Sequence, residues 1–131
     1  MEWKLFNDKN PEFASPEWYK DIVSAHHLEE WHHRDRLLIA ADMAQRAVSL
    51  GASTVVDLGC GDGGLLSLLK ERGIESWGYD LMPNNINYAV HVRNVDARYT
   101  NFMSNDIVYG DVVIMTEVLE HLEDPHRTLR E

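Results

Sequence analysis

The sequence VVDLGCGDGG, at residues 55–64, places an aspartate and three glycines at alternate positions: Asp57, Gly59, Gly61 and Gly63. Glycine adopts backbone angles that other residues avoid, and it lets a ligand approach the main chain closely. A helix that begins directly after such a loop adds N–H groups without intrahelical partners. The pattern is therefore typical of a loop that binds a small molecule through its backbone, since a purely structural turn needs fewer glycines.

Two classes of ligand fit this loop. Gly59, Gly61 and Gly64 also satisfy G-x-G-x-x-G, the fingerprint of dinucleotide binding. A dinucleotide brings a pyrophosphate, yet the loop is acidic and no Lys or Arg occurs between residues 51 and 69. S-adenosylmethionine carries a sulfonium, an ammonium and one carboxylate without phosphate, so an acidic loop favours it. The dinucleotide hypothesis stays open, because such loops bind phosphate mainly through N–H groups and the helix dipole.

A second group of reactive side chains lies near the end of the sequence. Glu117, Glu120 and His121 stand at i, i+3 and i+4, and on a helix they would share one face. Two carboxylates and an imidazole could hold a divalent metal, but no further ligand is evident nearby, so we predict no metal site. His121 could instead act as a general base toward an attacking nucleophile, or close a strand–helix turn by hydrogen bonding.

The periodicity of apolar residues predicts the elements that position these groups. Residues 16–50 have a helical pattern, in two helices, and the second is marked by apolar residues at helical spacing: Leu37, Ala40, Ala41, Ala44 and Val48. Four strands are predicted by short apolar runs at residues 53–59, 74–80, 91–95 and 111–116. Helical patterns follow the first two strands, at residues 61–73 and 84–90, and a last helix is expected to begin at Asp124. Strands and helices that alternate in this way predict a parallel sheet built from right-handed βαβ units.

At this point the chain resembles the class I S-adenosylmethionine-dependent methyltransferases, a Rossmann-like family. The resemblance rests on VVDLGCGDG and on DVVIMTEVLEHLEDP, and it extends from about residue 35 to the end. It implies an α/β fold whose parallel sheet, in the order 3-2-1-4, is flanked by helices. It also implies a single domain over residues 1–131, with residues 1–50 as an N-terminal helical extension and residues 51–131 as the core.

The resemblance further implies a cofactor site and a reaction, in which a methyl group moves from S-adenosylmethionine to an O, N or C nucleophile of a small molecule. The methionine part of the cofactor would lie against Asp57 and the backbone of Gly59, Cys60 and Gly61. Asp80, at the carboxyl end of the second strand, would accept hydrogen bonds from the two ribose hydroxyls. The remaining implied contacts are Leu81 and Met82 on the adenine, Asp96 and Ala97 near its amino group, and Thr116 and Glu117 at the reactive end. Glu117 and His121 are the catalytic candidates.

The chain departs from this family in the number of strands. The family has seven, in the order 3-2-1-4-5-7-6, whereas only four are predicted here, so the core is expected to be incomplete at its C-terminal end. Three explanations remain open: a fragment, a homodimer paired through the exposed edge of the fourth strand, and a degenerate relative that binds a ligand without catalysis. The alternative functions are accordingly an NAD(P)-linked oxidoreductase and a non-catalytic cofactor-binding or assembly module.

Composition excludes several other classes. The 131 residues carry a net charge of −10, which argues against a nucleic-acid partner because phosphate backbones are bound by Lys and Arg. A single cysteine, Cys60, excludes an intrachain disulfide and fits a reducing compartment. The N-terminus has no signal-peptide pattern, and no apolar run approaches the roughly 20 residues of a membrane helix. We therefore expect a cytoplasmic protein with no membrane association.

Overall fold

The computed structural model describes residues 28–100 and 107–116 of the chain. In chain order its elements are α3 (Trp31–Ser49), β1 (Thr54–Leu58), α4 (Gly64–Glu71), β2 (Glu75–Asp80), α5 (Pro83–His91), β3 (Ala97–Tyr99) and β4 (Val112–Ile114). The helices predicted to begin near residue 16 and at Asp124 lie outside the described residues.

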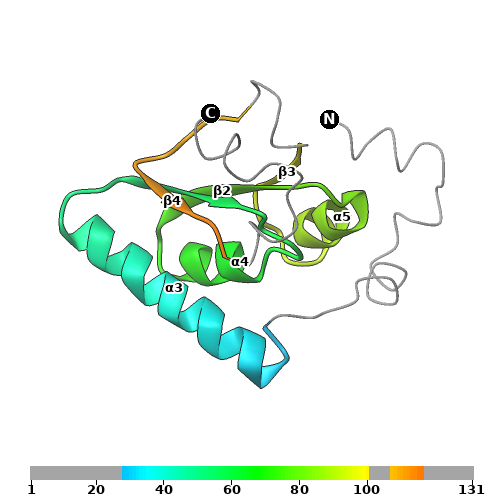
Figure 1. Cartoon of the computed structure of the whole chain (residues 1–131), viewed down its shortest axis with the longest axis horizontal. Coiled ribbons are helices and arrows are strands. Elements are labelled where there is room, and N and C mark those ends of the chain that lie inside the picture. The colour runs from blue at the N-terminus through cyan, green and yellow to red at the C-terminus, as the bar shows by residue number, and fades with distance from the viewer. Residues whose placement is uncertain (1–27, 101–106, 117–131) are drawn as a thin grey trace.

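The strands form one parallel sheet in the order β3-β2-β1-β4, which confirms the predicted order and the Rossmann-like class (Figure 1). In the register, Asp57 of β1 lies between Gly78 of β2 and Ile114 of β4. Because the strands are parallel, the carboxyl ends of β1 and β2 meet at the same edge of the sheet. The loop after β1 and the side chain of Asp80 are therefore neighbours.

The core confirms the helical pattern of α3. Its apolar residues Leu37, Ala40, Ala41 and Ala44 are buried in a cluster with Val55 of β1 and Leu65 and Leu69 of α4. α3 and α4 thus lie side by side against the sheet, with α4 in contact with β2 and α3 in contact with β4 (Figure 1). A second cluster packs Leu66 of α4 and Ile86 and Ala89 of α5 against Ala97 of β3. The two clusters pack the helices onto the sheet, and Cys60 of the glycine loop is buried in the second.

The third strand is the element whose predicted position was wrong. It lies at Ala97–Tyr99, because α5 continues to His91 and the chain then turns before it enters the sheet. In this turn Asn94 has a φ of 62°, and the N–H of Val95 donates to the carbonyl of Ala89 at 3.2 Å. The apolar residues that resemble a strand belong to the end of α5 and to this turn, and Val95 is buried with α5 in the second cluster.

None of the helices in the described residues is a candidate membrane span. Within residues 28–100 and 107–116, each helix falls short of the length or the apolarity needed to cross a bilayer.

Candidate functional site

The loop between β1 and α4 is tied to the end of β2 by its own backbone. The N–H groups of Gly59 and Cys60 both donate to the carbonyl oxygen of Tyr79, at 2.7 and 2.9 Å. The N–H of Gly61 donates to Oδ1 of Asp80 at 3.3 Å. Gly63 has a φ of 82°, and a Cβ there would lie 2.8 Å from that of Ala89, so this position requires glycine for both its conformation and its packing.

Asp62 occupies the N-terminus of α4. Its Oδ1 accepts a hydrogen bond from the N–H of Gly64 at 3.1 Å, and its Oδ2 pairs with Nη2 of Arg93 at 3.0 Å. Both side chains of this ion pair are buried, and Nε of Arg93 also donates to the carbonyl of Asp62 at 3.0 Å. The protein's own carboxylate therefore fills the position at which a helix N-terminus would bind an anion.

This pair corrects one part of the charge argument from the sequence. In the sequence argument, Asp62 is a negative charge available to a ligand. In the folded chain, Arg93, 31 residues away in sequence, compensates that charge. The loop is acidic in sequence, whereas its charge in space comes from Asp57 and from Asp80 at the neighbouring strand end. No local pattern marks Arg93, because the contact depends on how α5 packs beside α4.

The N–H groups of the glycine loop are largely used within the chain. Gly63 donates to the carbonyl of Cys60 at 3.0 Å, so five of the six N–H groups from Gly59 to Gly64 have acceptors in the protein itself. A loop that binds a pyrophosphate needs such groups free and directed at the ligand. The geometry therefore disfavours a dinucleotide.

Asp57 is a buried carboxylate at the centre of the site. It is 3% exposed, and its Oδ1 has no hydrogen-bond partner among the described residues. Burial, together with the nearby charge of Asp80, raises the pKa of Asp57 from 3.8 to about 7, while Arg36 lowers it. Arg36, on α3, is a residue that the sequence analysis missed, because nothing in a helical pattern indicates which polar position faces the end of β1.

Asp80 stands at the carboxyl end of β2, as predicted. Its Oδ2 accepts hydrogen bonds from the N–H of Met82 at 3.1 Å and from Nδ2 of Asn85 at 3.3 Å. With the contact from Gly61, these bonds are at the long end of the usual range, so a ligand hydroxyl could compete for the carboxylate. Leu81 and Met82 follow it with exposed apolar side chains. Asn85 was also missed, although its place in the first turn after Asp80 was a usable signal.

Cys60 contributes to the site through its backbone. Its side chain is buried and packs in the core with Leu66 and Ile86. Burial, followed by the charges of Asp57 and Asp80, raises the pKa of the Cys60 thiol, so the thiolate needed for nucleophilic chemistry is suppressed.

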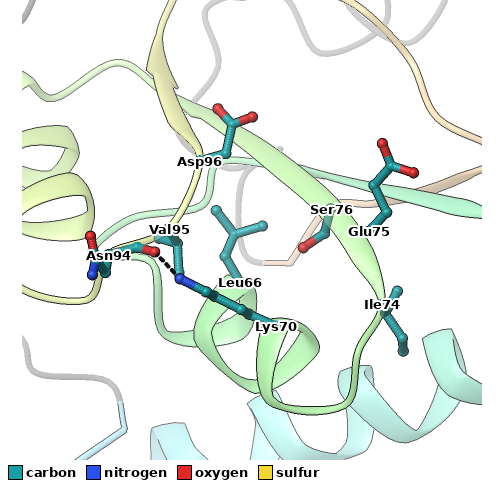
Figure 2. Close-up of a pocket in the computed structure, with 8 residues that line it drawn as sticks. All are labelled: Leu66, Lys70, Ile74, Glu75, Ser76, Asn94, Val95 and Asp96. Atoms are coloured by element: carbon teal, nitrogen blue, oxygen red, sulfur yellow. Dashed lines mark hydrogen bonds between the residues drawn. The ribbon is translucent and has the colours of Figure 1, made fainter.

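The structure contradicts the predicted position of Asp96 and Ala97. They were expected after the third strand, but Asp96 precedes β3 and Ala97 is its first residue, in register with Gly78 of β2. Their contact with the adenine amino group stays a prediction. Asp96 there pairs with Arg98 at 2.9 Å. Asp96 and Lys70 also line a hollow of about 360 Å³. The amine of Lys70 donates to the carbonyl of Asn94 at 2.6 Å, and the carboxylate of Asp96 points away from that amine (Figure 2).

The last predicted residues lie at or beyond the end of the described chain. Thr116 follows β4, as expected, and lines a groove of about 430 Å³ between β4 and α3. Glu117, Glu120 and His121 fall outside the described residues, so their roles stay predictions. In the described ranges, no three His, Cys, Asp or Glu side chains gather closely enough to hold a metal ion.

Comparison with known proteins agrees with this geometry. A family described as a methyltransferase domain matches residues 18–131. The chain belongs to this family. The match confirms the resemblance to the class I methyltransferases, and it includes the whole of the glycine loop and both carboxylate-bearing strand ends.

Individual relatives of this methyltransferase-domain chain are distant and longer. A ubiquinone biosynthesis O-methyltransferase of Coxiella burnetii is 27% identical over 93 residues, which cover 66% of this chain and 40% of the relative. The SAM-bound amino pentose methyltransferase CalS10 of Micromonospora echinaspora is 28% identical, with a TM-score of 0.53 over 66% of this chain and 36% of that one. The PH0226 protein of Pyrococcus horikoshii, 24% identical with a TM-score of 0.64 over 82% of this chain and 53% of that one, shares the fold. The chain thus spans about two fifths of the length of the curated relatives it matches.

The buried pair of Asp62 and Arg93 generates a first prediction. Arg93→Met leaves the Asp62 carboxylate buried without its cation, so we expect the free energy of unfolding to fall by about 3 kcal/mol. The double variant Asp62→Asn/Arg93→Met should recover much of this loss. Chemical denaturation measures both, and Arg72→Met, which breaks the more exposed pair with Asp42, should cost no more than about 1 kcal/mol. Equal losses for Arg93→Met and Arg72→Met would contradict the assignment.

The raised pKa of Asp57 generates a second prediction. The folded chain holds this proton up to about pH 7, whereas the ordinary pKa of an Asp side chain is 3.8, so the contribution of Asp57 to stability is lost as the pH rises through about 7. Asp57→Asn removes the ionisable group, so at about pH 8 the variant should be more stable than wild type by about 1–3 kcal/mol, with a smaller difference at about pH 5. Denaturant titrations at the two pH values test this, with exposed Asp42→Asn as the control. A difference that does not change with pH would argue against it.

Proposed function

We propose that this chain binds S-adenosylmethionine at the carboxyl ends of β1 and β2 and supports methyl transfer to an O, N or C nucleophile. One observation carries the choice of ligand. Five of the six N–H groups from Gly59 to Gly64 already have acceptors within the chain, whereas Asp57 and Asp80 present carboxylates at adjacent strand ends. This set of groups suits a ligand with a cation and a diol and without phosphate.

Each part of the ligand has a partner of matching chemistry. Asp80 would accept hydrogen bonds from the ribose hydroxyls, in place of the long contact from Gly61. Leu81 and Met82 offer apolar surface to the adenine, being 38% and 56% exposed. Asp57 would face the ammonium of the methionine part. Arg36, whose charge lowers the pKa of Asp57, would be a partner for the carboxylate of that same part.

Methyl transfer requires no covalent intermediate on the protein. S-adenosylmethionine, when bound, supplies a methyl group on a sulfonium that is already a reactive donor. The residues of the site would then act by holding the donor at a fixed position and by excluding water from it. Glu117 and His121 stay predictions as the groups that handle the acceptor's proton.

We propose a small-molecule acceptor. Two relatives support this class: CalS10 is an amino pentose methyltransferase, and the Coxiella burnetii protein is an O-methyltransferase of ubiquinone biosynthesis. The net charge of −10 gives a nucleic-acid acceptor little electrostatic attraction. Pairing of two copies through the β4 edge and a cytoplasmic location stay predictions.

The choice of ligand is tested by isothermal titration calorimetry. S-adenosylhomocysteine, the demethylated product, should bind with a Kd in the micromolar range, about −8 kcal/mol, because the adenosine and amino-acid contacts are retained. NAD should give no heat, since its pyrophosphate finds few free N–H donors. Binding of NAD alone would favour an oxidoreductase. Cofactor binding without methyl transfer to any acceptor in a radiolabel screen would favour a non-catalytic module.

The ribose contact is tested by substitution. Asp80→Ala should weaken binding of S-adenosylhomocysteine by about 1.5–3 kcal/mol, because charge-assisted hydrogen bonds to the diol are lost. Asp42→Ala, which removes an exposed carboxylate on α3, is the matched control and should leave the affinity unchanged within about 0.5 kcal/mol. Equal effects of the two substitutions would remove Asp80 from the site.

A further inference from the structure

The carboxylate of Asp57 is unusual for a side chain in the middle of a sheet. It lies on a central strand between Gly78 and Ile114, so neither neighbouring position offers a side-chain hydrogen-bond donor. Its Oδ1 is fully buried and has no hydrogen-bond partner in the described chain. A buried ionised oxygen without a donor costs several kcal/mol, whereas a protonated carboxyl group is much cheaper to bury.

The groups around Asp57 come from each element that packs against it. Arg36 faces it from α3 and favours its ionised form, whereas Asp80 at the end of β2 disfavours it. From the loop, Cys60 is a buried thiol whose own ionisation is opposed by Asp57, and Asp62 is paired with Arg93. From β4 the neighbour is Ile114, which carries no charge. Within the part of the chain that the structure describes, the charge of Arg36 does not offset the combined effect of burial and Asp80 on Asp57.

From this geometry we infer that Asp57 carries a proton before the ligand binds and releases it to solvent when the ligand's ammonium group comes to lie beside it. The inference rests on the proposed function, because it assigns the amino-acid part of the ligand to Asp57. The step balances simply: the O–H bond of the Asp57 carboxyl breaks, a buffer molecule takes the proton, and a carboxylate–ammonium pair replaces it. Asp57 thereby selects ligands that bring a positive charge to this depth of the site.

The inference sets the direction of the pH dependence. Before binding, Asp57 is mostly protonated below about pH 7, and after binding the ammonium holds it ionised. Binding therefore releases about one proton at about pH 6, and the association constant should rise about tenfold per pH unit until it levels off near pH 7. The ligand's own α-ammonium titrates near pH 8, above this window.

The experiment is a titration of S-adenosylhomocysteine into the full chain at about pH 6, in phosphate and in imidazole buffer. These buffers differ in ionisation enthalpy, so the difference between the two binding heats counts the protons released. Wild type should release about one proton. The carbonyl band of the protonated Asp57 carboxyl group should be lost on binding, which gives a negative band in the bound-minus-free infrared difference spectrum. Asp57→Asn should release none and should bind with an affinity that does not change with pH between about 5.5 and 7.

Two controls make the outcomes distinct. Asp42→Asn removes an exposed carboxylate on α3 and should release the same proton as wild type. If wild type binds S-adenosylhomocysteine with equal heats in both buffers, the inference is overturned and the proposed function stands. If wild type does not bind it at any pH, the proposed function itself falls. The buffer comparison and the infrared band are measured on wild type, so they decide the question even if Asp57→Asn fails to fold.

Discussion

The carbonyl oxygen of Tyr79 accepts hydrogen bonds from both Gly59 and Cys60 as the chain leaves β1. This three-way contact requires parallel pairing of β1 with β2, and it bends the loop back over the end of β2. Gly78 makes the approach possible, because a Cβ there would lie 2.6 Å from that of Cys60. The remaining features follow from it: Gly61 reaches Asp80, Asp62 binds the N–H of Gly64 at the start of α4, and Asp57 is buried at the end of β1.

The second organising feature is the distribution of charge. Three carboxylates lie close together, and each has a different environment: Asp57 near the end of β1, Asp62 in the loop after it, and Asp80 at the end of β2. Asp62 is compensated by Arg93 and has a structural role. Asp80 is held by backbone and amide donors at the rim, where a ligand can reach it. Asp57 is buried without a donor at one oxygen, which leaves it dependent on protonation or on a cation from outside. Burial and hydrogen-bond geometry, rather than residue type, separate these roles.

Much of this site could be predicted from the sequence, because its elements are local. The apolar period of α3, the β-branched run of β1, the glycines after it and an aspartate at the end of β2 are each visible within a few residues. The third strand could not be placed in the same way. The valines at residues 90, 92 and 95 resemble a β-branched strand, yet they belong to the end of α5 and the turn after it, since burial against α4 and β3 outweighs the local pattern.

The sequence by itself determined the order of elements, the glycine loop and the family, because these depend on residue types at short, regular spacing. Only the tertiary structure decided which of the loop's groups remain free for a ligand. The contacts that settle it join residues far apart in the chain, Arg93 to Asp62 and Arg36 to Asp57, and no pattern in either segment specifies its partner. The tertiary structure also decides the ionisation of Asp57, because its pKa depends on burial and on charges from α3 and β2 rather than on its neighbours in sequence.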